Sequence, residues 1–148
     1  MTGRREAVSV LNQSLFGIVR EFERFRTSIA REHGVTVTEL RALSRVAAGQ
    51  QVTPKQLAQQ LELTTGAVTA LTDRLVGAGL LAREPHPTDR RSLLLGPTDA
   101  GARLMDDVIA QYEQIVAQST LGIDVEKLEE FAALLDRVVA KGSEIRVA

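Results

Sequence analysis

The sequence predicts a mainly α-helical fold that carries one small β-hairpin. Three observations support this fold class. Apolar residues recur every three or four positions along both ends of the chain, which is typical of helices with one buried face. Residue pairs that cap helices recur through the middle third. Between positions 80 and 97, two short apolar runs flank a proline-containing turn, as in a hairpin. We expect one domain over residues 1–148.

The composition indicates an ordinary globular chain and excludes several kinds of site. Hydrophobic residues make up 44% of the sequence and charged residues 25%. The chain contains no cysteine, which excludes disulfides, thiolate zinc sites and thiol-based redox sensing, and fits a cytoplasmic protein. We expect neither a signal peptide in the N-terminal run MTGRREAVSV nor a membrane-spanning segment later in the chain.

The N-terminal segment is expected to form one long helix. Its apolar residues alternate at spacings of three and four, which lays a single stripe along the helix. They are Val8, Leu11, Leu15, Ile18, Phe22, Phe25 and Ile29. Gly34 is the expected stop, because glycine readily adopts the left-handed conformation that ends many helices.

Two capping boxes predict two short helices in the middle of the chain. In this pattern a Ser or Thr and a Glu or Gln three residues later each bond the backbone N–H of the other. The pattern occurs at Thr36–Glu39 and again at Thr53–Gln56, where Pro54 takes the first helical position. We expect the first helix to end at position 47 or 48, before Gly49, and the second to end near Leu61.

A third helix is expected between Thr64, as its N-cap, and Gly79, as the left-handed residue that closes it. Its buried face is formed by Val68, Leu71 and Leu75. Two helices joined by a turn of three or four residues, with small polar residues at the start of the second, describe a helix-turn-helix.

The start of the third helix carries the candidate DNA-reading residues. A helix N-terminus without bulky side chains lets short donors and backbone amides approach bases and phosphates in the major groove. Thr65, Gly66, Ala67 and Thr69 meet this requirement, and Arg74 is long enough to reach a phosphate or a guanine. Helix-turn-helix pairs are also common in all-α proteins, so this segment alone leaves a non-DNA-binding helical protein open.

The stretch REPHPTDRRSLLLGPTDAG supplies a hairpin directly after these helices, which describes a wing. The expected strands are Leu80–Glu84 and Ser92–Leu95. Asp89 can bond the backbone of the turn, which would leave Arg90 and Arg91 at a rigid tip. A narrow minor groove has a strong negative potential into which an arginine can insert. The alternative is that Asp89 caps the turn while both arginines remain solvated.

The C-terminal third predicts two further helices. Their apolar stripes are Met105, Ile109, Tyr112 and Val116 in one, and Leu128, Phe131, Leu135 and Val138 in the other. Leu121–Asp124 is the expected connection, with Asp124 as an N-cap. Any single stripe could form an intramolecular core. Three long stripes in a chain this short favour a helical dimer interface.

The net charge of −1 conceals a gradient. Residues 1–103 carry 14 Lys and Arg against 10 Asp and Glu, a balance of +4, whereas residues 104–148 carry 4 against 9, a balance of −5. Local positive potential, not total charge, attracts a phosphate backbone. The basic surplus therefore lies in the part that contains the hairpin, although the same split also fits a solvated surface.

These segments resemble the MarR (multiple antibiotic resistance regulator) family of bacterial winged-helix transcription factors. The resemblance is carried by TVTELRAL, TPKQLAQQL, TTGAVTALTDRLVGAGLLARE and DRRSLLLGPTDAG, the last of which contains the D-x-R wing signature. It covers nearly the whole chain, and the wing signature is its most specific part.

The resemblance implies a homodimer that binds double-stranded DNA. It assigns residues 1–33 and 102–148 to dimerisation helices and residues 36–101 to the winged helix-turn-helix. It places the recognition-helix contacts at Thr65, Gly66, Ala67, Thr69 and Arg74. In the wing, Asp89 would orient the loop and Arg91 would enter the minor groove, with Arg90 as a second candidate.

The chain departs from the family pattern at three positions. Pro97 stands where relatives usually have leucine, so we expect the second strand to end near Leu95. Ala70 replaces a residue that is often polar or basic, and Ala67 offers no side-chain hydrogen bond. More of the affinity should therefore come from phosphate contacts and groove shape. Since cysteine is absent, the peroxide-sensing branch of the family is excluded.

The resulting hypothesis is a ligand-responsive repressor that binds an inverted repeat as a homodimer, without a cofactor or a metal. Its expected partners are DNA, a second copy of the chain and a small-molecule effector, for which His33 is the candidate residue. His86, before the wing tip, is expected to be solvated or near a phosphate, and two separated histidines without cysteine do not make a metal site.

Two other classes of function are alternatives to this hypothesis. A dimeric all-α interaction module that has lost DNA binding would explain the near-neutral charge and the few base-reading side chains. An enzyme has little support, because the sequence has no glycine-rich phosphate loop and no Ser/His/Asp or Cys/His set.

Overall fold

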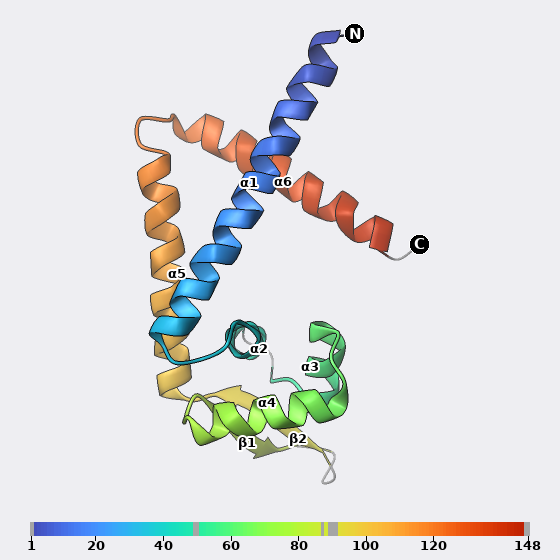
Figure 1. The fold of residues 1–148 in the computed structure, drawn as a ribbon, viewed down its shortest axis with the longest axis vertical. Helices are drawn as coiled ribbons and strands as arrows, with labels where there is room; N and C mark the ends of the chain where they lie inside the picture. The colour runs from blue at the N-terminus through green and yellow to red at the C-terminus, as the bar shows by residue number, and fades with distance from the viewer. Residues whose placement is uncertain (1, 49–50, 87, 89–91, 147–148) are drawn as a thin grey trace. The chain divides into compact units, whose positions relative to one another are not determined.

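The computed structural model describes residues 2–48, 51–86, 88 and 92–146. Within them the chain forms six helices and one two-stranded antiparallel sheet, so the predicted fold class is confirmed (Figure 1). The elements in chain order are α1 (Thr2–Glu32), α2 (Val37–Ala47), α3 (Pro54–Leu61), α4 (Thr65–Gly77), β1 (Leu81–Pro85), β2 (Leu93–Pro97), α5 (Asp99–Ser119) and α6 (Val125–Arg146). The chain divides into two compact units, Met1–Val108 and Ile109–Ala148, with the boundary inside α5.

The core of the first unit is built around α2, which contacts α1, α3, α4 and β2. Its buried aliphatic side chains are Ile29, Leu40, Leu43, Val46, Val52, Leu57, Leu61, Val68, Leu71, Leu75, Leu81, Leu94, Leu95, Leu104 and Val108. The predicted buried face of the third helix is therefore confirmed, since all three of its residues belong to this set. Burial of these side chains supplies most of the favourable free energy that folds the first unit, which contains the helix-turn-helix and the hairpin (the winged part).

Both predicted capping boxes are present. Thr36 Oγ1 accepts a hydrogen bond from Glu39 N at 3.1 Å, and Glu39 Oε2 accepts one from Thr36 N at 2.7 Å. Thr53 and Gln56 repeat this arrangement at 3.2 and 2.8 Å. Thr64 caps α4 through its hydroxyl, as predicted. These bonds satisfy backbone N–H groups that have no partner within the helix.

The predicted helix ends are also largely confirmed. α2 ends at Ala47 and α3 at Leu61. Gly34 and Gly79 have φ angles of 67° and 70°, in the left-handed region that glycine adopts without steric cost. Gly49, the expected end of the first short helix, lies outside the described residues.

The start of α5 is packed tightly against the turn that follows α4. Thr98 Oγ1 donates to the Gly79 carbonyl at 2.6 Å and accepts from Gly101 N at 3.1 Å. A Cβ atom on Gly101 would lie 2.1 Å from the carbonyl oxygen of Leu80. Glycine is therefore required there, because any side chain would collide with the backbone.

The expected end of the second strand near Leu95 is wrong, because β2 continues to Pro97. Leu95 N donates to Val52 O at 2.8 Å, on the side away from β1, whereas Thr98 N donates to Leu80 O at 3.2 Å. Backbone N–H groups alternate in direction along a strand, so position 97 also faces away from β1. A proline there removes no bond between the two strands.

The two C-terminal helices and their connection are confirmed as α5, α6 and the residues between them. Gly122 in this connection has a φ angle of 77°. Asp124 immediately precedes α6, and its Oδ2 accepts from Lys127 Nζ at 3.3 Å. In the described part of the chain, no helix is long and apolar enough to cross a membrane.

Candidate nucleic-acid interface

α3 and α4 form a helix-turn-helix whose second helix lies beside the hairpin (Figure 1). α3 ends at Leu61, Glu62 adopts a left-handed conformation with φ of 56°, and α4 begins at Thr65. The Glu62 N–H bonds to carbonyls of α3 and thereby closes that helix. The three-residue turn and the cap together fix the point at which α4 emerges.

One exposed face of α4 brings together the predicted recognition residues. They are Thr65, Gly66, Ala67, Thr69 and Arg74, and each is exposed. The opposite face is buried in the core through its aliphatic residues and Thr72. The helix is therefore anchored on one side and open on the other, as an element that enters a groove must be.

The side chains on this face offer few hydrogen bonds to a base. Thr69 Oγ1 donates to Thr65 O at 2.9 Å, so its hydroxyl proton is engaged within the helix while its oxygen can still accept. Ala67 and Ala70 are exposed and carry no polar atom on their side chains. The geometry suits close approach of the helix backbone more than extensive side-chain readout.

Arg74 is joined to a buried carboxylate on α2. Its Nε donates to Glu39 Oε1 at 2.5 Å, although the two residues are 35 positions apart. Glu39 is 6% exposed, whereas the side chain of Arg74 is 61% exposed. Burial by itself raises the pKa of the Glu39 carboxyl, but the hydrogen bonds from Thr36 and Arg74 outweigh it and hold the pKa below its usual value.

A second ion pair joins α4 to the hairpin. Arg83 Nη2 on β1 donates to Asp73 Oδ1 at 2.5 Å and to Thr72 Oγ1 at 3.2 Å. Thr72 is buried, and its hydroxyl donates onward to Thr69 O at 3.0 Å. Asp73 lies on the exposed face of α4, where an unpaired carboxylate would repel phosphates. Its pairing with Arg83 reduces that repulsion.

Sequence reasoning missed the part that Glu39 and Arg83 take in this site. Glu39 was assigned to a helix cap, and Arg83 was given no function. Pairing between residues 39 and 74, or between 73 and 83, has no local sequence pattern, because each pair joins different elements. The available signal was weaker: each residue is a charged group within a predominantly apolar segment.

The predicted wing-tip residues Asp89, Arg90 and Arg91 lie outside the described residues. The strands that lead to the tip are paired from Leu81 with Pro97 to Pro85 with Leu93. Beyond them His86 N donates to Ser92 O at 3.2 Å. The base of the wing is thus held by a continuous ladder.

The effector candidate His33 lies in the connection between α1 and α2. It is partly buried, and its Nε2 atom is buried without a hydrogen-bond partner among the described residues. A buried ring nitrogen without a partner is costly for a protein, and a bound polar group would relieve that cost.

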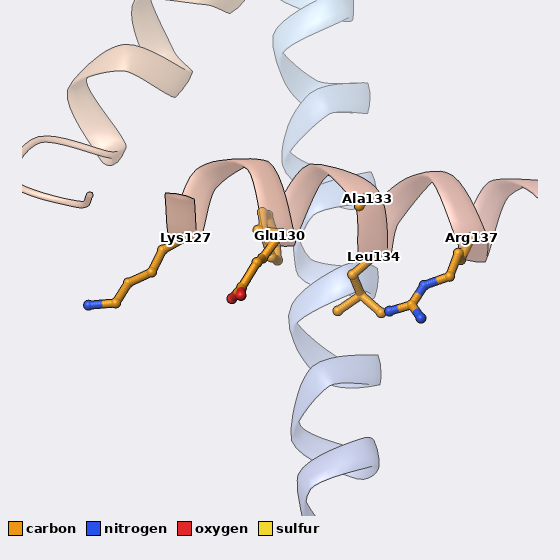
Figure 2. A pocket seen from close by; sticks show the side chains of 6 residues that line it. Lys127, Glu130, Ala133, Leu134 and Arg137 are labelled. Atoms are coloured by element: carbon orange, nitrogen blue, oxygen red, sulfur yellow. The ribbon is translucent and has the colours of Figure 1, made fainter. Parts of the chain in front are cut away.

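A separate hollow of about 730 Å³ lies on α6 (Figure 2). It is lined by Lys127, Glu130, Phe131, Ala133, Leu134 and Arg137. All of these belong to one helix of the second unit, and none was predicted as a site residue. The described residues contain no group of three or more His, Asp or Glu arranged to hold a metal ion.

Comparison with known proteins gives consistent matches. A sequence model described as MarR family matches residues 33–92. The uncharacterized HTH-type transcriptional regulator YcgE of Bacillus subtilis is 31% identical over 121 residues, which cover 82% of this chain and 76% of that protein.

Solved structures resemble the chain over most of its length. A MarR family protein from Bacillus stearothermophilus superposes with a TM-score of 0.80 at 20% identity, covering 94% of this chain and 97% of the other. A MepR mutant from S. aureus, solved bound to an oligodeoxyribonucleotide, gives a TM-score of 0.66 at 18% identity, covering 88% and 96%. At these identities the likeness concerns the fold.

Proposed function

This chain belongs to the MarR family, and on that basis we propose that it is a DNA-binding transcriptional regulator that acts as a homodimer. The observation that carries the proposal is the open face of α4, which is anchored in a helix-turn-helix and flanked by the hairpin. The relative YcgE, which is 31% identical in sequence, is named a transcriptional regulator and not an enzyme. Such a regulator acts on the chromosome and hence in the cytoplasm.

DNA is contacted by two parts of the winged helix-turn-helix in residues 36–101. The recognition residues are Thr65, Gly66, Ala67, Thr69 and Arg74, which share the exposed face of α4. In the wing, Asp89 orients the loop while Arg91, with Arg90 beside it, reaches the minor groove. A MepR mutant with the same fold, solved bound to an oligodeoxyribonucleotide, supports DNA binding as the function of this fold.

The dimer is formed by the helices in residues 1–33 and 102–148. Large apolar side chains remain exposed in these helices and in the connection before α6, including Phe16 at 67%, Val125 at 70% and Leu121 at 81%. A second copy would remove these side chains from water, since large exposed apolar surface is typical of interfaces. A two-fold dimer binds an inverted repeat with half-sites about 10 base pairs apart.

Regulation by a small molecule follows a shift between two dimer conformations. An effector near His33 would favour a spacing of the two α4 helices that the operator does not accept. To lower the occupancy of the operator, the effector must bind that conformation more tightly than the DNA-binding one by about 1–3 kcal/mol, a common size for allosteric coupling. Equal effector affinity for free and operator-bound dimer, measured by titration calorimetry, would contradict this part of the proposal.

Selection of random duplex DNA by the purified protein at two salt concentrations tests the proposal directly. A dimeric DNA reader should enrich an inverted repeat and bind it more weakly at higher salt, because phosphate contacts release counterions. Replacing Arg91 by alanine should then weaken binding by about 1–3 kcal/mol, because the variant loses the proposed groove contact. No enrichment at low salt would instead favour an interaction module without DNA binding.

A further inference from the structure

Glu39 uses both oxygens of its carboxylate on groups from different elements. Oε2 accepts from Thr36 N at 2.7 Å, within the cap of α2, and Oε1 accepts from Arg74 Nε at 2.5 Å, on α4. The carboxylate is therefore the point at which the start of α2 meets the recognition helix. A helix cap needs only the first of these bonds, so the second calls for a separate explanation.

The bond to Glu39 fixes the direction of the Arg74 guanidinium. Arginine donates from Nε and from two Nη groups in one rigid plane, so a bond at Nε determines where the Nη groups lie. The side chain is 61% exposed, and the Nη groups remain to meet a phosphate or a base edge. A buried carboxylate is a firm anchor, because its loss of hydration makes the remaining bonds necessary.

We propose that Glu39 is a positioning residue for DNA binding, which acts by orienting Arg74 and by holding α4 against α2. The proposal rests on the proposed DNA-binding function and adds a residue that itself makes no contact with DNA. Asp73, which precedes Arg74 in the sequence, holds α4 to β1 through Arg83. The helix is therefore fixed to α2 and to the hairpin by two adjacent residues, Arg74 and Asp73.

The substitution Glu39→Gln can keep one of the two hydrogen bonds while removing the other. The glutamine amide has one oxygen that accepts and one nitrogen that donates, so it can serve either Thr36 N or Arg74 Nε but not both. Retaining the cap turns the amide nitrogen toward the guanidinium, which is also a donor. Since Gln is an accepted partner in a capping box, as at Gln56, we expect α2 to remain folded.

A double-mutant cycle on operator affinity tests the proposal with the full-length protein. The variants are Glu39→Gln, Arg74→Gln and the double variant, assayed by fluorescence anisotropy on the selected inverted repeat at low salt. Glu39→Gln should weaken binding roughly tenfold in the wild-type background and by less than about twofold when Arg74 is already replaced. Thr36→Ala is the matched control, since this substitution weakens the same cap of α2 but leaves the Glu39 carboxylate in place. The Thr36→Ala variant should have a lower thermal midpoint than the wild type, while its operator affinity stays within about twofold of the wild-type value.

Each other outcome overturns the proposal in a recognisable way. Equal weakening by Glu39→Gln in both backgrounds would show that Glu39 acts independently of Arg74. Unchanged affinity, or a loss matched by Thr36→Ala, would show that the residue only caps α2. If circular dichroism shows that Glu39→Gln is unfolded, the cycle is run with Glu39→Asp, whose shorter side chain cannot span both donors. Absence of operator binding by the wild-type protein would instead overturn the proposed function itself.

Discussion

The winged helix-turn-helix and the long helices differ in how much of their apolar surface the chain itself covers. In α4 of the winged part, Val68, Leu71 and Leu75 are spaced three and four residues apart and are buried. On the predicted stripes of α1 and α6, by contrast, Val8 is 55% exposed and Phe131 is 46% exposed. The same spacing of three and four residues produced both results. Periodicity thus identifies an apolar face, whereas only the surrounding structure tells whether the chain covers it.

The largest effect should come from emptying the core of the winged part. Leu43→Ala removes a side chain with no exposed surface and should lower the free energy of unfolding by about 2–5 kcal/mol, because the cavity cannot fully collapse. Urea unfolding measures this loss, and Ser44→Ala on the exposed side of α2 is the control. A loss below about 1 kcal/mol would show that Leu43 does not lie in a tightly packed core.

The next largest effect should come from the close contact between Gly101 in α5 and the backbone carbonyl of Leu80. Gly101→Ala places a methyl group against the Leu80 carbonyl and should destabilise the protein by about 1–3 kcal/mol or more. Gly142→Ala in α6 is the matched control. A Cβ there meets nothing within 4 Å, so the change should stabilise by about 0.5–1 kcal/mol through helix propensity. Thermal unfolding of both variants should therefore shift in opposite directions, and shifts in the same direction would contradict the packing at Leu80.

The long helices should respond to dilution instead. Phe131→Ala removes a half-exposed aromatic side chain from α6 and should raise the dimer dissociation constant about tenfold, as for a residue that anchors an interface. Sedimentation at several concentrations measures the constant, with Glu129→Ala on the same helix as the control. An unchanged constant would place the interface elsewhere.

The smallest expected effect is a pH dependence of the free energy of unfolding that arises from Glu39 in the winged part. The pKa of Glu39 is lowered in the folded chain, so its ionised form contributes stability at pH values above the ordinary glutamate pKa. That contribution is lost as the pH falls through the lowered value. Urea unfolding from neutral to acidic pH should show a shallower decline for Glu39→Gln than for the wild type. Parallel curves would mean that the carboxylate contributes no net stability when ionised.

Local structure was largely predictable from the sequence. The caps at Thr36, Thr53 and Thr64 and the left-handed Gly34 and Gly79 all lie where the pattern placed them. These features depend on bonds between residues at most five positions apart, so a short stretch of sequence contains everything that determines them. The exposed positions of α4 were predictable for the same reason, because helical spacing separates them from the buried Val68, Leu71 and Leu75.

Contacts between elements were not predictable in this way. The end of β2 was predicted too early because proline has no N–H to donate to a neighbouring strand. Whether position 97 faces β1 depends on how β2 pairs with β1 and with Val52, which lie in other segments. The pairs that fix α4, Glu39 with Arg74 and Asp73 with Arg83, depend on which elements become neighbours.

The sequence by itself therefore determined the helices, the hairpin, the exposed face of α4 and the resemblance that led to the family. The tertiary structure alone decided which charged groups meet on that face and which apolar stripes the chain buries. The physical reason is range. Capping and periodicity act within one or two helical turns, whereas ion pairs and burial depend on distances that exist only after distant segments have packed together.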